Sequence, residues 1–182
     1  MLIPRYYFSN DYRDFYEYFL TQPHTVKIFR KDEYLWNYGD PITHIYYIIS
    51  GAAMTTLEHE NGSRKISSFH GEGTVFPGFH RSVFKIEQSI ATRAVTDMET
   101  LCFTGAAFLE MLSENSRLML STLDWYASYI NLLLYESAHQ DYNSSFVKLC
   151  NLLYLFTQNS PGGRTDRIDL TQENIAEILT GT

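Results

Sequence analysis

The chain has 182 residues, of which 45% are hydrophobic and 19% are charged. This composition excludes a disordered chain and predicts a soluble globular protein that buries roughly 70% of its extended surface. No stretch approaches the ~20 apolar residues that span a bilayer, and the first residues do not resemble a signal peptide, so we expect a cytoplasmic protein. The formal charge of -7 argues against a general phosphate-binding surface on this stretch of chain.

The first predicted element is an amphipathic helix over Ser9–Thr21, with Ser9 as its N-cap. Its apolar stripe has the i, i+3, i+4, i+7 spacing and consists of Tyr12, Phe15, Tyr16 and Phe19. We expect this stripe to dock the helix on the domain that follows.

Residues 24–103 show short β-rich runs separated by turn residues, which predicts an antiparallel sandwich or barrel. The expected strands are Val26–Phe29, His44–Ile49, Ala52–Leu57, Lys65–Phe69, Ser89–Val95 and Leu101–Phe103. Asn61 and Gly62 lie between two of these runs and predict a hairpin with a type I′ turn. Cys102 and Cys150 lie far apart in apolar surroundings, so both are expected to be core residues without a disulfide.

Residues 108–140 contain no proline or glycine and predict a short helix followed by a long one. Residues of the long helix repeat at the alternating steps of three and four that are typical of a dimerising helix. We call this set the seam: Met119, Leu123, Tyr126, Ile130, Leu133 and Ser137, followed by Gln140. A parallel homodimer follows from the seam, although the same stripe would also fit a helix that lies on its own sheet.

A further helix is expected to begin at Asn143 or Ser144 and to end at 159–163. Its predicted buried stripe is Phe146, Leu149, Cys150, Leu153 and Phe156. Thr171 is expected to cap a last helix, with an incomplete capping box because Asn174 stands in place of Glu or Gln. The chain stops directly after this helix, so we expect it to be a fragment or to lack its C-terminal part.

The order of these parts resembles the CRP/FNR superfamily of bacterial transcription regulators over nearly the whole chain. The matching residues are Gly39-Asp40, Tyr47–Gly51, Asn61-Gly62, 71–78 and Leu170–Leu179. The resemblance implies a mainly β fold with α-helices: a jelly roll, a long dimerisation helix and the beginning of a winged helix-turn-helix. It implies an effector domain over 1–107, a dimerisation helix region over 108–141 and an incomplete DNA-binding domain over 142–182.

The resemblance also implies that the protein binds DNA as a homodimer and that Thr171 and Gln172 belong to the DNA-binding surface. The recognition helix would then lie beyond Thr182. Family members commonly carry a glycine in the turn before that helix, whereas Thr180 occupies this place here and Gly181 follows it. The geometry of that turn is therefore in question.

The cyclic-AMP-binding members of the family anchor the phosphate with an Arg-Ser pair, and Gln88-Ser89 stands at that place here. A neutral amide cannot form a charge-assisted pair with phosphate, so we do not expect cyclic AMP as the effector. We expect a largely apolar or aromatic ligand instead, unless the same residues form an ordinary packed core. The candidate effector residues are Phe76, Gly78, Phe79, Gln88, Ser89, Tyr126, Tyr129, Ile130 and Leu133.

The six histidines form no HxH pattern with later metal ligands, so we expect no metal and no cofactor. His70 and His80 are the candidates if the protein, like some relatives of the family, senses haem. No catalytic motif such as GxSxG or HExxH occurs, so we expect no enzyme. A cupin-like metalloenzyme and a sensor module that acts without DNA remain the alternatives to a transcription regulator.

Overall fold

The computed structural model describes residues 3–79, 84–158 and 170–180. Within these residues the strands form a sheet of order β1-β6-β5-β8-β3 and a second sheet of order β2-β9-β4-β7. The strands are β1 (Tyr7–Phe8), β2 (Thr25–Phe29), β3 (Tyr34–Trp36), β4 (His44–Ser50), β5 (Ala52–Glu58), β6 (Arg64–Gly71), β7 (Val75–Phe76), β8 (Ile90–Ala94) and β9 (Met98–Thr104). All pairings are antiparallel except that of β1 with β6.

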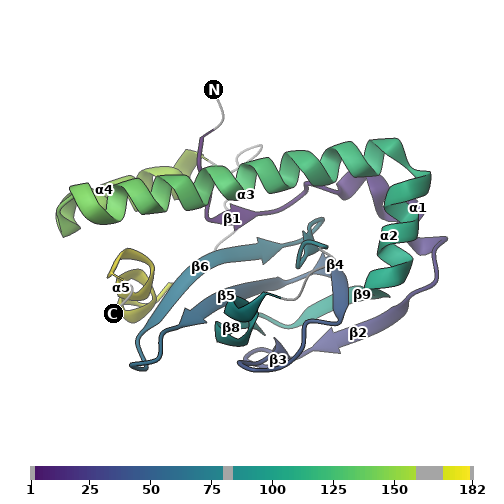
Figure 1. Cartoon of the computed structure of the whole chain (residues 1–182), viewed down its shortest axis with the longest axis horizontal. Coiled ribbons are helices and arrows are strands. Elements are labelled where there is room, and N and C mark those ends of the chain that lie inside the picture. The colour runs from purple at the N-terminus through teal and green to yellow at the C-terminus, as the bar shows by residue number, and fades with distance from the viewer. Residues whose placement is uncertain (1–2, 80–83, 159–169, 181–182) are drawn as a thin grey trace.

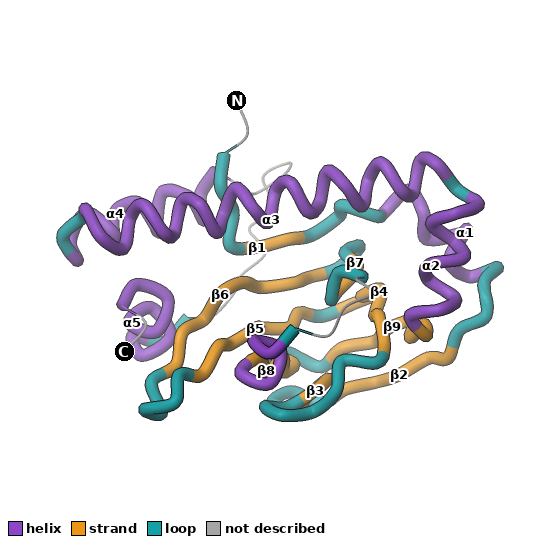
Figure 2. The backbone as a smooth tube through the Cα atoms, in the orientation of Figure 1, coloured by secondary structure: helices purple, strands orange, loops and turns teal. Residues whose placement is uncertain are grey.

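Most helices come after the last strand in the sequence; only two short helices near the N-terminus and one between β7 and β8 come earlier. They are the 3-10 helices η1 (Arg13–Phe15) and η2 (Lys85–Ser89), and α1 (Tyr16–Leu20), α2 (Gly105–Glu114), α3 (Ser116–Tyr142), α4 (Ser145–Gln158) and α5 (Gln172–Thr180). The long helix α3 runs lengthwise above β1 and β6, with α4 beside one of its ends and α5 near β6 (Figures 1 and 2). No helix among the described residues is long and apolar enough to cross a membrane.

The predicted fold class is supported in its coarser part: two β-sheets, several helices and the long α3 are present. The predicted strands correspond to β2, β4, β5, β6, β8 and β9. The division of residues 108–140 into a short and a long helix is confirmed, because Asn115 ends α2 and its side chain caps α3 by accepting the Leu118 N–H at 3.1 Å.

The N-terminal helix is shorter than the predicted Ser9–Thr21. The backbone N–H groups of Asn10 and Tyr12 donate to the carbonyls of Glu72 and Gly73, each at 2.8 Å. These residues are therefore tied to the chain after β6. Asn10 also has φ +62°, a left-handed conformation that cannot continue into a right-handed helix, so the predicted Ser9 cap is wrong. The stripe nevertheless packs on the β-domain, since the Phe19 ring lies 5.6 Å from that of Phe103.

The hairpin between β5 and β6 forms at the predicted place with a different turn. Gly62 has φ +86°, whereas Asn61 does not share this left-handed conformation, so the type I′ prediction is wrong. The Gly62 N–H donates to the carbonyl of His59 at 2.8 Å, and the Asn61 side chain accepts the N–H of Ser63 at 2.9 Å. The turn is therefore stabilised by the side-chain bond from Asn61 to Ser63 and has only one residue with a positive φ angle.

The buried face of α4 is rotated from the predicted one. Leu152 and Leu155 are buried, whereas Phe146 is 74% exposed and Leu153 is exposed as well. Helix α4 contacts the β-domain through Phe156, whose ring lies 6.1 Å from that of Tyr6. The rotation also exposes Cys150, so only the prediction of a buried Cys102 is confirmed.

Candidate effector site and dimer seam

One face of α3 is buried against the β-domain. Its buried side chains are Leu118, Thr122, Trp125, Ser128 and Leu132. The Ser128 hydroxyl accepts a hydrogen bond from Nε of Arg5 at 3.2 Å, which ties the N-terminal segment to this face. Trp125 is the largest of these side chains, and its ring stacks on that of Tyr129 with centroids 5.4 Å apart. This face therefore belongs to the core of the single chain.

Aromatic rings from both sheets fill the space beneath Trp125. The ring of Phe76 on β7 stacks on that of His70 at 3.6 Å and on that of Trp36 at 5.5 Å. The Trp125 ring lies 6.2 Å from Phe76, and the ring of Phe8 packs against His70 from another side at 5.7 Å. The rings form a continuous contact from β3 to α3, and we call them the aromatic cluster.

His70 is the one ionisable group at the centre of this cluster, and it is fully buried. Its Nε2 lies 3.0 Å from the Ser68 hydroxyl, and its Nδ1 has no hydrogen-bond partner among the described residues. Burial, with a smaller contribution from the Arg5 charge, lowers the pKa of His70 to about 3. The imidazole is therefore neutral at physiological pH, and its stacked rings give it the environment of a packed core residue rather than that of an iron ligand. The other haem candidate, His80, lies outside the described residues.

Tyr126 links α3 to the segment that follows β7. Its hydroxyl donates to the carbonyl of Phe79 at 2.5 Å. Gly78 permits this approach, because a Cβ atom at that position would lie only 2.5 Å from the Tyr126 hydroxyl oxygen. Burial raises the pKa of Tyr126 to about 12, so the hydroxyl remains a donor over the physiological range. The contact therefore fixes Phe79 against α3.

The structure brings only part of the predicted effector set together. Phe76, Gly78, Phe79, Tyr126 and Tyr129 lie at or beside the aromatic cluster. The others do not join them there: Gln88 is exposed in η2, where Ser89 is half-buried, and Ile130 and Leu133 are exposed. The effector role of all nine stays a prediction.

Sequence reasoning named His70 only as a haem candidate and missed Trp36 and Trp125 beside it. Trp36, His70 and Trp125 come from three separate elements and belong to no spaced motif.

The opposite face of α3 is apolar and exposed. The exposed fractions of the seam side chains are 44% for Met119, 58% for Leu123, 53% for Ile130 and 48% for Leu133. Leu120 and Leu134 beside them are 62% and 66% exposed, and they widen the stripe in a way the predicted seam did not include. The alternative in which this stripe lies on the chain's own sheet is therefore wrong. Ser137 is exposed at the end of the seam, and the side chain of Gln140 lies outside the described residues.

Helix α5 begins with a reciprocal cap. The Thr171 hydroxyl accepts the backbone N–H of Asn174 at 3.1 Å, and the Asn174 side chain accepts that of Thr171 at 3.2 Å. The predicted incomplete box is therefore wrong, because the shorter amide side chain closes it. Thr171 and Gln172 are both exposed. The side chain of Thr180 and the whole of Gly181 lie outside the described residues.

Comparison with protein families places residues 26–115 among the cyclic nucleotide-binding domains. The match spans 90 of the 182 residues, just under half of the chain. The matched residues cover the strands from β2 to β9, apart from Thr25, and the whole of α2. No curated protein sequence matches the chain significantly.

Solved structures share the fold of this domain and of the helices after it. CprK complexed with OCPA matches with a TM-score of 0.73 and 16% identity, over 100% of this chain and 83% of its own. The c-di-GMP-responsive global regulator CLP of Xanthomonas campestris has a TM-score of 0.74 and 14% identity, and the match covers 92% of this chain and 84% of CLP. FixK2 from Bradyrhizobium japonicum has a TM-score of 0.69 and 17% identity, and the match covers 87% of this chain and 79% of FixK2. The resemblance to CRP/FNR-type regulators is thereby confirmed in the fold.

Among the described residues, no group of three or more His, Cys, Asp or Glu side chains is placed to hold a metal ion.

Proposed function

We propose that the protein is an effector-responsive, DNA-binding transcription regulator of the CRP/FNR type that acts as a homodimer in the cytoplasm and has no enzymatic activity. In this proposal 1–107 form the effector domain with a jelly roll, 108–141 the dimerisation helix region and 142–182 the first part of a winged helix-turn-helix. Support comes from the fold shared with regulators and from the contact between α4 and α5.

The exposed apolar face of α3 is the observation that carries this proposal. A monomeric protein rarely exposes a continuous apolar stripe, and such a stripe marks an interaction site. The seam has the three-four spacing with which two parallel helices pack. Two copies joined along Leu123, Ile130 and Leu133 would bury the stripe and place two DNA-binding parts symmetrically, as a two-fold DNA site requires.

The aromatic cluster supports an apolar or aromatic effector. A neutral hydroxyl, that of Tyr126, stands at its edge and a neutral imidazole, that of His70, at its centre, whereas Gln88 offers no charge to a phosphate. Proteins of this fold respond to different ligands, since one matching structure is CprK in complex with o-chlorophenolacetic acid and another is a c-di-GMP-responsive regulator. We therefore propose an effector other than cyclic AMP.

Tyr126 is the proposed coupling residue, because it lies on the seam and also binds the carbonyl of Phe79. An effector that displaces Phe79 would release the hydroxyl and change the packing at one seam position. The ligand shifts the equilibrium between two helix arrangements only if it contacts them differently. Ile130, one turn further along, is the second proposed coupler.

The test of this function is a selection from a pool of random DNA duplexes with the intact gene product. The proposal expects enrichment of a two-fold symmetric sequence by the wild type and none by Ile130→Asp. Circular dichroism and sedimentation verify that the wild type used is folded and dimeric. Failure of that dimer to enrich any sequence would overturn the DNA-binding proposal and favour a sensor module that acts through protein partners.

A further inference from the structure

Strand β6 carries buried side chains on both of its sides. Neighbouring strand residues point to opposite sides of a sheet, so Phe69 and His70 face different parts of the molecule. Both are completely buried. On the inner side of β6, the His70 ring stacks on that of Phe76 at 3.6 Å within the aromatic cluster. On the outer side, the Phe69 ring meets that of Phe156 on α4 at 6.3 Å. One strand therefore touches both the proposed effector site and the proposed DNA-binding part.

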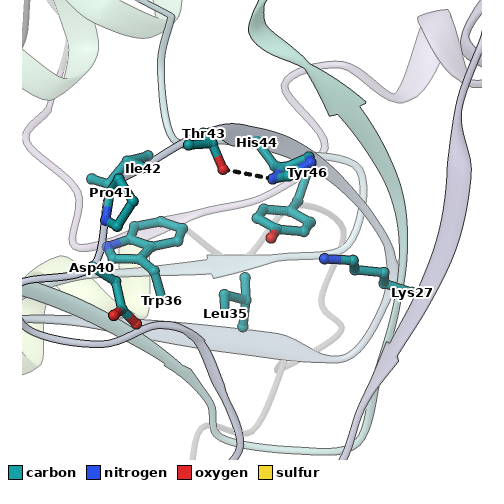
Figure 3. A pocket seen from close by; sticks show the side chains of 9 residues that line it. All are labelled: Lys27, Leu35, Trp36, Asp40, Pro41, Ile42, Thr43, His44 and Tyr46. Atoms are coloured by element: carbon teal, nitrogen blue, oxygen red, sulfur yellow. Dashed lines mark hydrogen bonds between the residues drawn. The ribbon is translucent and has the colours of Figure 1, made fainter.

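The inner side of β6 is joined to both sheets through rings. Phe76 of β7 stacks on Trp36 of β3, with ring centroids 5.5 Å apart. Trp36 stacks in turn on Tyr46 of β4 at 6.5 Å, and Figure 3 shows the side chains of this last pair. Close-packed side chains transmit displacements to their neighbours. We therefore expect a ligand that moves rings of the aromatic cluster to shift β6 at His70.

The outer side of β6 is covered by α4 and α5. Ile66 lies on this side with Phe69, because they pair with alternate residues of β5, and it is also completely buried. Helix α5 contacts β6 directly, as its place in Figure 1 shows. The same apolar core contains Leu152 and Leu155 of α4 and Ile178 of α5. A helix of nine residues is not stable alone in water, so α5 depends on this docking.

An ion pair adds a charged contact to the docking. Nζ of Lys65 on β6 pairs with a carboxylate oxygen of Glu136 on α3, and the two side chains are only 26% and 13% exposed. Burial lowers the pKa of Lys65, and the nearby charge of Lys148 on α4 lowers it further. Glu136 therefore compensates positive charge at the point where β6 meets α3 and α4. We regard it as a positioning residue for these elements.

We propose that β6 is a second coupling element, which holds α4 and α5 on the effector domain and shifts them when an effector moves the rings around His70. All the contacts on this route lie within one chain, so the route does not depend on the seam. That the shift regulates DNA binding rests on the proposed function, whereas the coupling itself does not.

The docking is tested with two matched substitutions of ion-paired glutamates. Glu136→Gln removes the charge that faces Lys65 while Lys148 still acts on it, and we expect the amides of α4 and α5 to exchange about fivefold faster. Glu58→Gln removes the partner of Arg64, an ion pair that stays within the β5–β6 hairpin, and should leave this exchange unchanged. Equal exchange in the two variants would overturn the docking.

The coupling is tested with a trifluoromethyl tag on Cys150, which is exposed on α4, whereas Cys102 is buried. His70→Gln changes the inner side of β6 and should shift the 19F resonance of the tag. Phe103→Leu, a change at a buried residue of β9 outside this route, is the control and should leave the resonance in place. Phe76→Leu replaces His70→Gln if circular dichroism shows that the latter is not folded.

The seam is tested as the competing route by repeating these measurements in the Ile130→Asp background. The proposal expects the same shift in both backgrounds. An unshifted resonance in the folded His70→Gln or Phe76→Leu variant, an equal shift in Phe103→Leu, or a shift that is lost in Ile130→Asp would overturn it. None of these measurements needs DNA, so a chain that shows the coupling but enriches no DNA sequence would refute the regulator and leave the role of β6 intact.

Discussion

The two faces of α3 carry side chains of similar hydrophobicity but meet different surroundings. Leu118, Trp125 and Leu132 are almost completely buried against the β-domain, whereas Leu123 and Ile130 are more than half exposed. One face is therefore needed to fold a single chain, and the other is available for a second copy. The contrast shows that stability and assembly are separable along one helix, and single substitutions can break each of them in turn.

The largest effect is expected on the buried face. Trp125→Ala should lower the free energy of unfolding by about 3–5 kcal/mol, because the substitution leaves a cavity among the rings of Phe76, His70 and Tyr129. Leu123→Ala on the exposed face should change it by less than about 0.5 kcal/mol. Urea denaturation measures both, in an Ile130→Asp background so that dimerisation does not contribute. Equal losses would contradict the division into two faces.

The buried face should also make stability depend on pH through His70. Its pKa is about 3 in the folded protein and near 6.5 when unfolded, so between these values the unfolded chain binds the proton more strongly. The free energy of unfolding should then fall as the pH is lowered from about 6 to 4, with a contribution of up to about 1.4 kcal/mol per pH unit from this residue. His70→Gln should remove that part of the slope. An unchanged slope in the variant would show that His70 is not held neutral.

Tyr126, at the border between the two faces, should have a smaller effect. Tyr126→Phe removes the donor to the Phe79 carbonyl and should lower the free energy of unfolding by about 1 kcal/mol. Tyr129→Phe is the matched control, since the Tyr129 ring packs in the cluster but its hydroxyl has no hydrogen bond with the described residues. Hydrogen exchange should also report faster opening around Phe79 in Tyr126→Phe alone. If Tyr126→Phe and Tyr129→Phe have the same free energy of unfolding and the same exchange rates around Phe79, Tyr126 is not the coupling residue.

The smallest effect is expected far from both faces, at the cap of α5. Thr171→Ala removes the acceptor for the Asn174 N–H and should weaken α5 locally by about 0.5–1 kcal/mol. Hydrogen exchange of the α5 amides measures the change, and Gln172→Ala serves as the control because Gln172 takes no part in the cap. Similar exchange in both variants would contradict the capping role.

Periodicity predicted the longer strands and helices of this fold, but it predicted neither the short strands nor the buried face of α4. The longer strands and the division between α2 and α3 follow from alternation, turns and the absence of helix breakers. Strands β1, β3 and β7 have too few residues to show a period. In α4 the predicted and observed faces share Phe156 but otherwise differ, because apolar residues lie around most of Phe146–Phe156 and did not single out Leu152 and Leu155 as the buried ones.

The candidate sites were predictable where one element carries them. The seam lies on a single helix, so its spacing indicated an apolar stripe, and the structure shows that stripe exposed. The aromatic cluster combines rings from β3, β6, β7 and α3, and such long-range contacts leave no local pattern.

Sedimentation equilibrium of the wild type beside Ile130→Asp tests the central claim, that the exposed face of α3 joins two copies. The account predicts a dimer for the wild type, a dimer dissociation constant raised at least tenfold in Ile130→Asp, and no change in Ala138→Asp, an exposed control off the seam. A wild type that remains monomeric at micromolar concentration, or an Ile130→Asp variant that dimerises as well as the wild type, would contradict it.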